Sequence, residues 1–175
     1  SCIQGKNKIA FVRVGENNPR IIKRVLDAGA DGIIIPMVNN IEDVKNAIAA
    51  VRYPPLGKRG VGLSRAQGYG FEFEKYLEKQ RKIEIIIQIE HIEAINNLES
   101  ILEIEGIDGT IIGPYDLSAS MGKPGKFEDD DVKKVLEKYE KISLQMKVSM
   151  GYHIVEPNVE KFIEMRNKGY SIIAL

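Results

Sequence analysis

Short apolar runs alternate with amphipathic segments along the whole chain. Six runs have the length and the composition of buried strands, and helical periodicity fills the intervals between them. Asn18 and Pro19 are a typical start for the first helix, and Gly29 is a typical end. We expect strands at residues 9–14, 32–38, 85–89, 109–113, 147–154 and 170–175. We expect helices at residues 20–28, 41–51, 72–81, 92–102, 131–144 and 158–167.

The pattern predicts an α/β protein with a parallel sheet. The expected strands are apolar on both faces and are separated by helices, which is typical of a sheet that helices cover. An open doubly wound sheet and a (β/α)8 barrel both agree with this pattern. A complete barrel has eight units and typically about 250 residues, whereas these 175 residues supply six units.

Composition excludes several classes of protein and favours one domain over residues 1–175. The 25 acidic and 25 basic residues balance, so no overall field attracts nucleic acid or an anionic membrane. The apolar runs are strand-sized and interrupted by charges, which predicts no membrane span. Cys2 is the single cysteine, which fits a reducing cytoplasm. The first residues show neither a signal peptide nor an initiating methionine, so we expect a fragment, a processed chain or a shortened one.

Two carboxylates follow apolar runs that read as strands. Glu90 directly follows the run at 85–89, and Asp116 comes shortly after the run at 109–113. Because parallel strands end at one edge of a sheet, these acids are expected at the same edge. Carboxylate oxygens are the ligands that Mg²⁺ and Mn²⁺ prefer. Arg13, Pro36 and His153 end other predicted strands and belong to the same edge.

Each of these residues also has a structural interpretation. Glu90 can be a solvated strand end or a member of an ion pair, and Asp116 can cap a turn. Arg13 can pair with a nearby surface acid, and His153 can be a structural histidine. His91 faces away from Glu90 if the strand alternation continues, which argues against a Glu–His metal pair.

Five segments together resemble a known family. They are Phe-Val-Arg-Val at 11–14, Ile-Ile-Ile-Pro-Met-Val at 33–38, Arg-Tyr-Pro-Pro-Leu-Gly-Lys-Arg-Gly-Val-Gly at 52–62, Gln-Ile-Glu at 88–90 and Gly-Pro-Tyr-Asp-Leu-Ser-Ala-Ser-Met-Gly at 113–122. The chain resembles the class II pyruvate aldolases of the HpcH/HpaI aldolase and citrate lyase family. The resemblance implies a (β/α)8 barrel of the phosphoenolpyruvate/pyruvate type, of which this chain supplies the third to eighth strands.

The resemblance also implies a chemistry. It predicts a divalent-metal-dependent aldehyde-lyase that cleaves a 4-hydroxy-2-oxo acid, from sugar or aromatic catabolism, into pyruvate and an aldehyde through a metal-stabilised enolate. Glu90 and Asp116 are expected to hold Mg²⁺ or Mn²⁺, with Co²⁺ as a further candidate. Arg13 is expected to hydrogen-bond the keto oxygen. The expected substrate-binding residues are Gln88, Gly113, Pro114, Tyr115, Asp116 and His153.

Two parts of the substrate site follow from local chemistry. Gln88 points to the same side as Glu90, two residues away, which places an amide beside the metal site. The backbone N–H groups of Tyr115 and Asp116 are expected to bind the substrate carboxylate, whereas Pro114 has no N–H to donate.

The sequence also leaves alternatives open. Relatives carry an Asp-x-Glu-His motif whose histidine serves acid/base catalysis, and this sequence has no such motif. A lyase of the citryl- or malyl-CoA type, or a catalytically silent relative that binds metal and oxo acid, therefore stays open. The resemblance implies a homo-oligomer, hexameric in relatives. The segment 58–69, with Arg59 and Arg65, is expected either over the active site or as a flexible connection, and the aromatic residues at 69–76 either between subunits or within the monomer.

Overall fold

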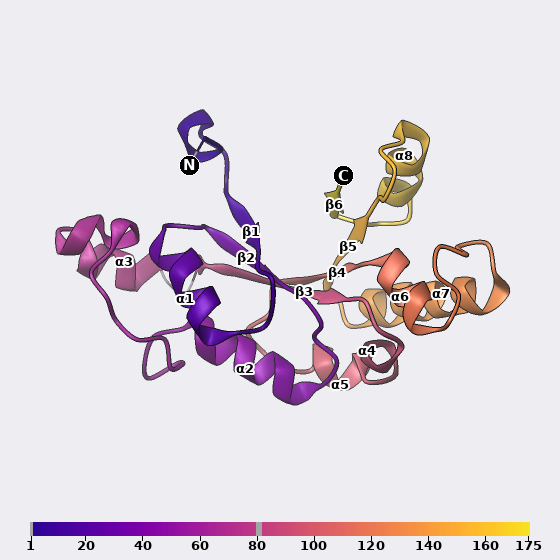
Figure 1. The fold of residues 1–175 in the computed structure, drawn as a ribbon, viewed down its shortest axis with the longest axis horizontal. Coiled ribbons are helices and arrows are strands. Elements are labelled where there is room, and N and C mark those ends of the chain that lie inside the picture. The colour runs from indigo at the N-terminus through magenta and orange to yellow at the C-terminus, as the bar shows by residue number, and fades with distance from the viewer. Residues whose placement is uncertain (1, 80–81) are drawn as a thin grey trace.

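The structure, a computed structural model, describes residues 2–79 and 82–175. Within these residues strands and helices alternate along the chain (Figure 1). The strands are β1 (Phe11–Arg13), β2 (Gly32–Ile35), β3 (Glu84–Ile89), β4 (Gly109–Ile112), β5 (Ser149–His153) and β6 (Ile172–Ala174). The α-helices are α1 (Pro19–Asp27), α2 (Ile41–Val51), α3 (Phe73–Lys79), α4 (Ile92–Asn96), α5 (Leu98–Leu102), α6 (Pro114–Ser120), α7 (Asp130–Gln145) and α8 (Val159–Asn167). Two 3₁₀ helices are η1 (Gln4–Lys6) and η2 (Arg65–Gly70).

All six predicted strands are present, and most predicted helices are confirmed. The Asn18 side chain accepts a hydrogen bond from the Arg20 amide at 2.9 Å, with Pro19 in the first turn, as its position predicted. The helix expected at 92–102 is instead divided into α4 and α5 at Asn97, whose side-chain amide donates to the Asn39 carbonyl at 2.9 Å. The predicted end of the helix at 72–81 lies outside the described residues.

Helix α6 was not predicted, because its segment reads as a loop containing glycine and proline. Gly113 precedes the helix and Pro114 occupies the first helical position, where its missing N–H costs nothing. The Ser118 hydroxyl donates to the Tyr115 carbonyl and accepts from the Gly125 amide, at 2.8 and 3.0 Å. These bonds tie the following loop to the helix, so the segment directly after β4 has a fixed shape.

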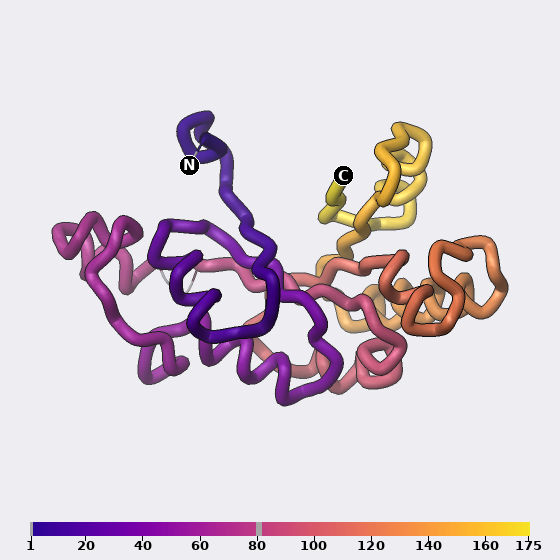
Figure 2. The backbone as a smooth tube through the Cα atoms, viewed as in Figure 1, coloured from indigo at the N-terminus to yellow at the C-terminus, as the bar shows by residue number. Residues whose placement is uncertain are grey.

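The strand order decides between the two predicted architectures. Every strand pairs in parallel with the next one in sequence, in the order β1-β2-β3-β4-β5-β6. A doubly wound sheet reverses its strand order, whereas this order never reverses. Because parallel crossovers are right-handed, such an order puts the helices on one face and curls the sheet around the other. The fold is therefore six strands of a (β/α)8 barrel, and both ends of the chain lie on the open side (Figures 1 and 2).

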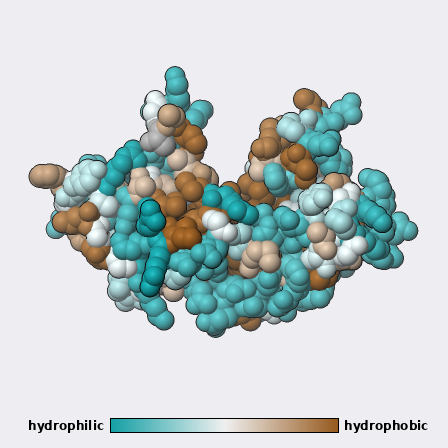
Figure 3. All heavy atoms as spheres, viewed as in Figure 1, coloured by the Kyte–Doolittle hydropathy of each residue, from teal (hydrophilic) through white to brown (hydrophobic). Residues whose placement is uncertain are grey.

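The two faces of the sheet have different surroundings. The face under the helices is a continuous apolar core, in which each buried aliphatic side chain contributes about 1.5–3 kcal/mol. Its fully buried strand residues include Ile33, Ile35, Ile85, Ile87 and Ile89. The inner face carries a cavity of about 320 Å³, lined by side chains that include Ile34, Ile86, Ile111 and Ile172. Figure 3 shows a hollow between the N-terminal and the C-terminal parts of the chain, with hydrophobic residues inside it.

The segment that follows α2 lies at the amino ends of the strands, opposite the predicted site. Arg59 donates to the Asp27 carboxylate at 2.7 Å, and Arg65 donates to the Ala28 carbonyl at 2.6 Å. Both acceptors are at the carboxyl end of α1, which runs back from the carboxyl ends of the strands. The expectation that these arginines lie over this chain's own active site is therefore wrong, because a connection from a helix to a strand lies at the other end of the barrel.

Arg59 is also the centre of a buried aromatic cluster. Its guanidinium lies 4.6 Å from the ring centre of Tyr53 and 5.6 Å from that of Tyr76. Gln67 is fully buried and donates to the Tyr53 hydroxyl at 2.8 Å. Tyr76 thus packs within the monomer, whereas Tyr69 and Phe71 are exposed. Within residues 2–79 and 82–175, no helix combines the length and the apolar composition needed to cross a membrane.

Candidate metal and substrate site

Glu90 lies directly after β3, at the carboxyl edge of the sheet, and is only 3% exposed. Its Oε1 accepts a hydrogen bond from the Met37 amide at 2.8 Å. Met37 has a φ of 53°, an uncommon value for a residue other than glycine. This left-handed turn after β2 aims a backbone amide at the carboxylate. Glu90 is therefore a positioned, buried acid and not a solvated strand end.

Gln88 connects Arg13 to the same site. It is buried, and its Oε1 accepts a hydrogen bond from the Arg13 Nε at 3.3 Å. Arg13 is exposed at the end of β1, so its guanidinium has access to a bound molecule. The structure thus brings Arg13, Gln88 and Glu90 together, although they come from two strands that are not neighbours in the sheet.

Gly113 has no side chain and so leaves room beside Gln88 and Glu90. A Cβ atom at this position would lie 3.2 Å from Gln88 Nε2, 3.3 Å from Glu90 Cβ and 3.4 Å from Glu90 Oε2. The first intrahelical bond of α6 runs from the Leu117 amide to the Gly113 carbonyl at 2.9 Å. The amides of Tyr115 and Asp116 precede that bond, in the turn where backbone N–H groups have no partner within the helix.

The charges at the site influence one another. Burial raises the pKa of Glu90 above its ordinary value, and the nearby Asp116 charge adds to the rise. The hydrogen bond from Met37, the Arg13 charge and the Gln88 amide act in the opposite direction. A divalent cation between the two acids would oppose the rise, because opposite charge favours the ionised carboxylate.

The donor set fits a hard divalent cation. Glu90 and Asp116 offer carboxylate oxygens, and Glu90 Oε2 faces the space that a Cβ at Gly113 would fill. In the part of the chain that the structure describes, no group of three or more His, Cys, Asp or Glu side chains is arranged for metal binding. In proteins, Mg²⁺ is usually bound by one or two carboxylates, with water and substrate as the other ligands.

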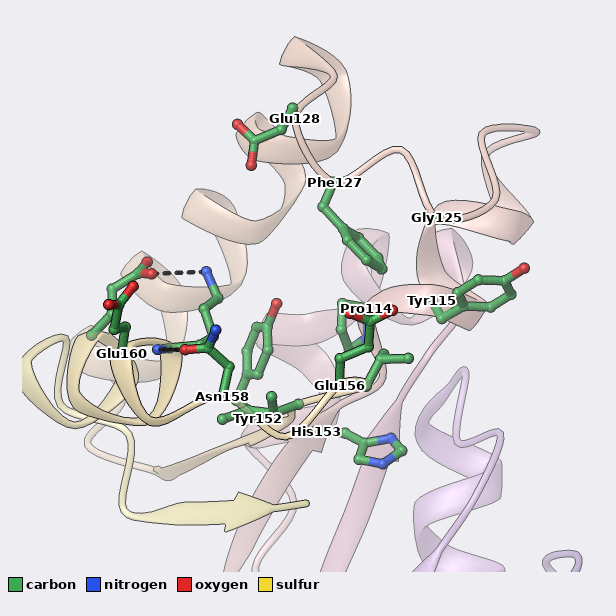
Figure 4. A pocket seen from close by; sticks show the side chains of 14 residues that line it. Pro114, Tyr115, Gly125, Phe127, Glu128, Tyr152, His153, Glu156, Asn158 and Glu160 are labelled. Carbon is green, nitrogen blue, oxygen red and sulfur yellow. Dashed lines mark hydrogen bonds and ion pairs between the residues drawn. The ribbon is translucent and has the colours of Figure 1, made fainter.

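His153 extends the site to β5. Ile89 is paired with Ile112, and Ile112 with Tyr152, so the next positions across β3, β4 and β5 are Glu90, Gly113 and His153. At the usual strand spacing the outer two are roughly 10 Å apart, with a glycine between them. His153 is exposed, and its ring points away from Tyr152 and Asn158 (Figure 4).

A cavity of about 630 Å³ adjoins this edge of the sheet. Pro114, Tyr115 and His153 line it together with residues from the segments after β4 and β5, such as Phe127 and Asn158. Neither Phe127 nor Asn158 was predicted from the sequence as a site residue. Their only signal in the sequence was that they follow strands, as barrel-site residues do.

Substituting Gly113 with alanine is expected to weaken Mn²⁺ binding roughly 10-fold, because the added methyl crowds Gln88 and Glu90 and shifts the carboxylate. Isothermal titration calorimetry measures the affinity. Gly5→Ala is the matched control, since a Cβ there meets nothing within 4 Å. Equal Mn²⁺ affinity in both variants would contradict this role of Gly113.

The fold and the site define a β/α-barrel protein with two acidic residues, Glu90 and Asp116, near the carboxyl ends of its strands. The model of the HpcH/HpaI aldolase/citrate lyase family matches residues 2–175, and the chain belongs to this family. A 2-keto-3-deoxy-L-rhamnonate aldolase of Klebsiella pneumoniae is 44% identical over 129 residues, which are 72% of this chain and 48% of that protein. The chain thus spans about half the length of the curated relatives it matches.

Solved structures share the fold. An HpcH/HpaI aldolase/citrate lyase family protein from Burkholderia cenocepacia matches with a TM-score of 0.89 and 29% identity, over 96% of this chain and 66% of that one. An HpcH/HpaI aldolase from Desulfitobacterium hafniense matches with a TM-score of 0.86 and 28% identity, over 99% of this chain and 67% of that one. The resemblance and the barrel architecture predicted from the sequence are both confirmed.

Proposed function

We propose that this chain forms the metal- and oxo-acid-binding part of a divalent-metal-dependent aldolase that releases pyruvate and an aldehyde from a 4-hydroxy-2-oxo acid. The observation that supports this proposal most is the buried Glu90. It accepts a hydrogen bond from the Met37 amide, lies beside Gly113, and has its pKa raised in part by the charge of Asp116. The aldolase names of the relatives support this class of reaction. Glu90 and Asp116 would hold Mg²⁺ or Mn²⁺, with Co²⁺ as a further candidate.

When bound, the cation supplies Lewis acidity at the keto oxygen of a 2-oxo acid. Arg13 then donates to that oxygen as negative charge develops there during cleavage of the C3–C4 bond. Gln88 holds the Arg13 side chain through the 3.3 Å hydrogen bond. The amides of Tyr115 and Asp116 bind the substrate carboxylate, and Gly113, Pro114 and His153 bound the space around it.

The protein that carries this chain is expected to release pyruvate from 4-hydroxy-2-oxo acids with Mn²⁺ and to lose this activity in EDTA. Coupling pyruvate to lactate dehydrogenase follows the reaction. Turnover that EDTA leaves unchanged would contradict the proposal. A covalent pyruvate adduct after borohydride treatment would indicate a Schiff base instead.

Replacing Arg13 with lysine is expected to lower kcat about 10-fold with a smaller effect on KM, because the charge is kept but the planar donor is lost. Steady-state kinetics at saturating Mn²⁺ measures both constants. Arg20→Lys is a suitable control, because Arg20 is also exposed but lies in α1, away from Gln88. An unchanged kcat in Arg13→Lys would exclude the assigned role.

A protein that binds metal and oxo acid without cleaving the oxo acid is the second candidate function. Such a protein would bind Mn²⁺ and pyruvate by calorimetry yet release no pyruvate from any oxo acid. The CoA-lyase alternative has less support. Four glutamates and one lysine line the cavity near this edge of the sheet, and their net negative charge would repel the phosphates of CoA.

We also infer that the protein assembles as a homo-oligomer and is cytoplasmic. Support for assembly comes from exposed apolar side chains at the surface of the chain. Exposed Tyr69 and Phe71 add apolar surface far from the site.

A further inference from the structure

The turn that follows β2 carries the backbone amide that donates to the Glu90 carboxylate. Met37 makes this hydrogen bond, at 2.8 Å, from a left-handed conformation with a φ of 53°. Residues other than glycine disfavour this conformation, because Cβ comes too close to the following carbonyl oxygen. With the rest of the turn in place, relaxation of Met37 to a negative φ would rotate its amide away from Glu90. Contacts from outside Met37 must therefore hold the turn.

Asn39, two residues after Met37, is held through both of its backbone polar groups. Its amide donates to the Asp43 carboxylate at 2.9 Å, in the first turn of α2. Its carbonyl accepts from the Asn97 side-chain amide, also at 2.9 Å, at the junction of α4 and α5. Val38, between Met37 and Asn39, is fully buried. These contacts fix the end of the turn and oppose the relaxation of Met37.

Asp43 also connects the turn to the segment that follows β1. Its amide donates to the Asn40 side chain at 3.0 Å, and its carbonyl accepts from the Asn17 side chain at 2.9 Å. Asn17 lies four residues after Arg13, which ends β1. One network of hydrogen bonds thus joins the segments after β1 and β2 to the helices that follow Glu90.

We propose that Asn97 and Asp43 are positioning residues for the metal ligand Glu90. They act through Asn39, because they hold the turn that directs the Met37 amide at the carboxylate. The inference rests on the proposed metal site, and it adds residues from two helices that set the affinity of that site. Removing a group that orients a metal ligand typically lowers metal affinity roughly 10- to 100-fold.

The first test is the affinity for Mn²⁺, measured by isothermal titration calorimetry. Asn97→Ala is expected to weaken binding about 10-fold, because the Met37 amide is then free to turn away from Glu90. The matched control is Asn96→Ala, which removes the neighbouring, exposed asparagine of α4.

Asp43 provides an independent pair of variants. Asp43→Ala should also weaken Mn²⁺ binding about 10-fold, because the Asn39 amide loses its acceptor. Asp43→Asn keeps a side-chain oxygen for that amide and should bind Mn²⁺ within about twofold of the wild type. Recovery in the asparagine variant distinguishes the hydrogen bond from a general need for the residue.

The second test needs no metal. Amide hydrogen exchange followed by NMR in EDTA should be at least about 10-fold faster at Met37 in Asn97→Ala and Asp43→Ala, because an amide exchanges when its hydrogen bond opens. The amide of Ile87, in the middle of β3, reports opening of the sheet and should change less. A loss of stability alone would speed up exchange at both amides equally.

The two tests separate this inference from the proposed function. If the wild type binds no Mn²⁺, the metal site fails, and the exchange at Met37 still decides whether Asn97 and Asp43 position its amide. Unchanged exchange at Met37 in Asn97→Ala, or an equal effect of Asn96→Ala, would overturn the inference. So would faster exchange at Met37 with unchanged Mn²⁺ affinity, or Asp43→Asn behaving like Asp43→Ala.

Discussion

Replacing Glu90 with glutamine is expected to lower metal-dependent pyruvate release at least about 100-fold, because a direct ligand matters more than the outer groups whose loss already costs 10- to 100-fold. The same change is expected to leave the metal-free protein at least as stable. A glutamine oxygen still accepts from the Met37 amide, and a neutral side chain avoids the penalty of burying a charge. The assay is pyruvate release with Mn²⁺, combined with thermal unfolding in EDTA and in Mn²⁺.

The pH dependence has a definite sign. Because burial raises the pKa of Glu90 in the folded state, its contribution favours folding at low pH and is lost as the pH rises through the raised pKa. The stability gained by Glu90→Gln in EDTA should therefore increase over that range. Mn²⁺ should raise the melting temperature of the wild type only. A variant that is still stabilised by Mn²⁺ would show that Glu90 is not a ligand.

Replacing Arg59 with alanine is expected to destabilise the fold by about 3 kcal/mol, because it leaves Asp27 paired only with the partly exposed Lys23 and removes a buried guanidinium stacked on Tyr53 and Tyr76. The effect should fall on stability alone, since Arg59 lies at the end of the sheet opposite Glu90. Urea unfolding measures the change in free energy, and calorimetry measures Mn²⁺ affinity under native conditions.

Arg65→Ala is the matched control for Arg59. Arg65 lies in the same segment and is exposed, with a hydrogen bond to the Ala28 carbonyl, so its loss should cost less than about 1 kcal/mol. Two outcomes would contradict the structural role: equal costs for both variants, or weaker Mn²⁺ binding in Arg59→Ala at unchanged stability.

The strands and most helices were predictable because their signals are local. Apolar runs fix the strands, and the cap at Asn18 fixes the start of α1 within one residue. Periodicity alone left the strand order open, since open sheets and barrels use the same βα units. Helix α6 was missed because it has only seven residues and begins with Pro114 in a segment that resembles a turn.

The candidate site was predictable in its side chains and not in its backbone. Arg13, Gln88 and Glu90 stand at strand ends, where the barrel rule brings such residues together, and the structure shows them in contact or close by. The hydrogen bond from the Met37 amide could not be predicted, because nothing in the sequence indicates a positive φ at a methionine. The position of Arg59 and Arg65 was left open between two alternatives, because a motif match does not say at which end of the barrel a connection lies.

The strand order has a consequence for how the chain folds during its synthesis. Within the described residues, each strand after β1 pairs with the strand made just before it, so a partner is already present when that strand leaves the ribosome. Every new βα unit can dock onto the edge that its predecessor leaves open, and the sheet grows in one direction as the chain emerges. The order of synthesis and the order of assembly are then the same.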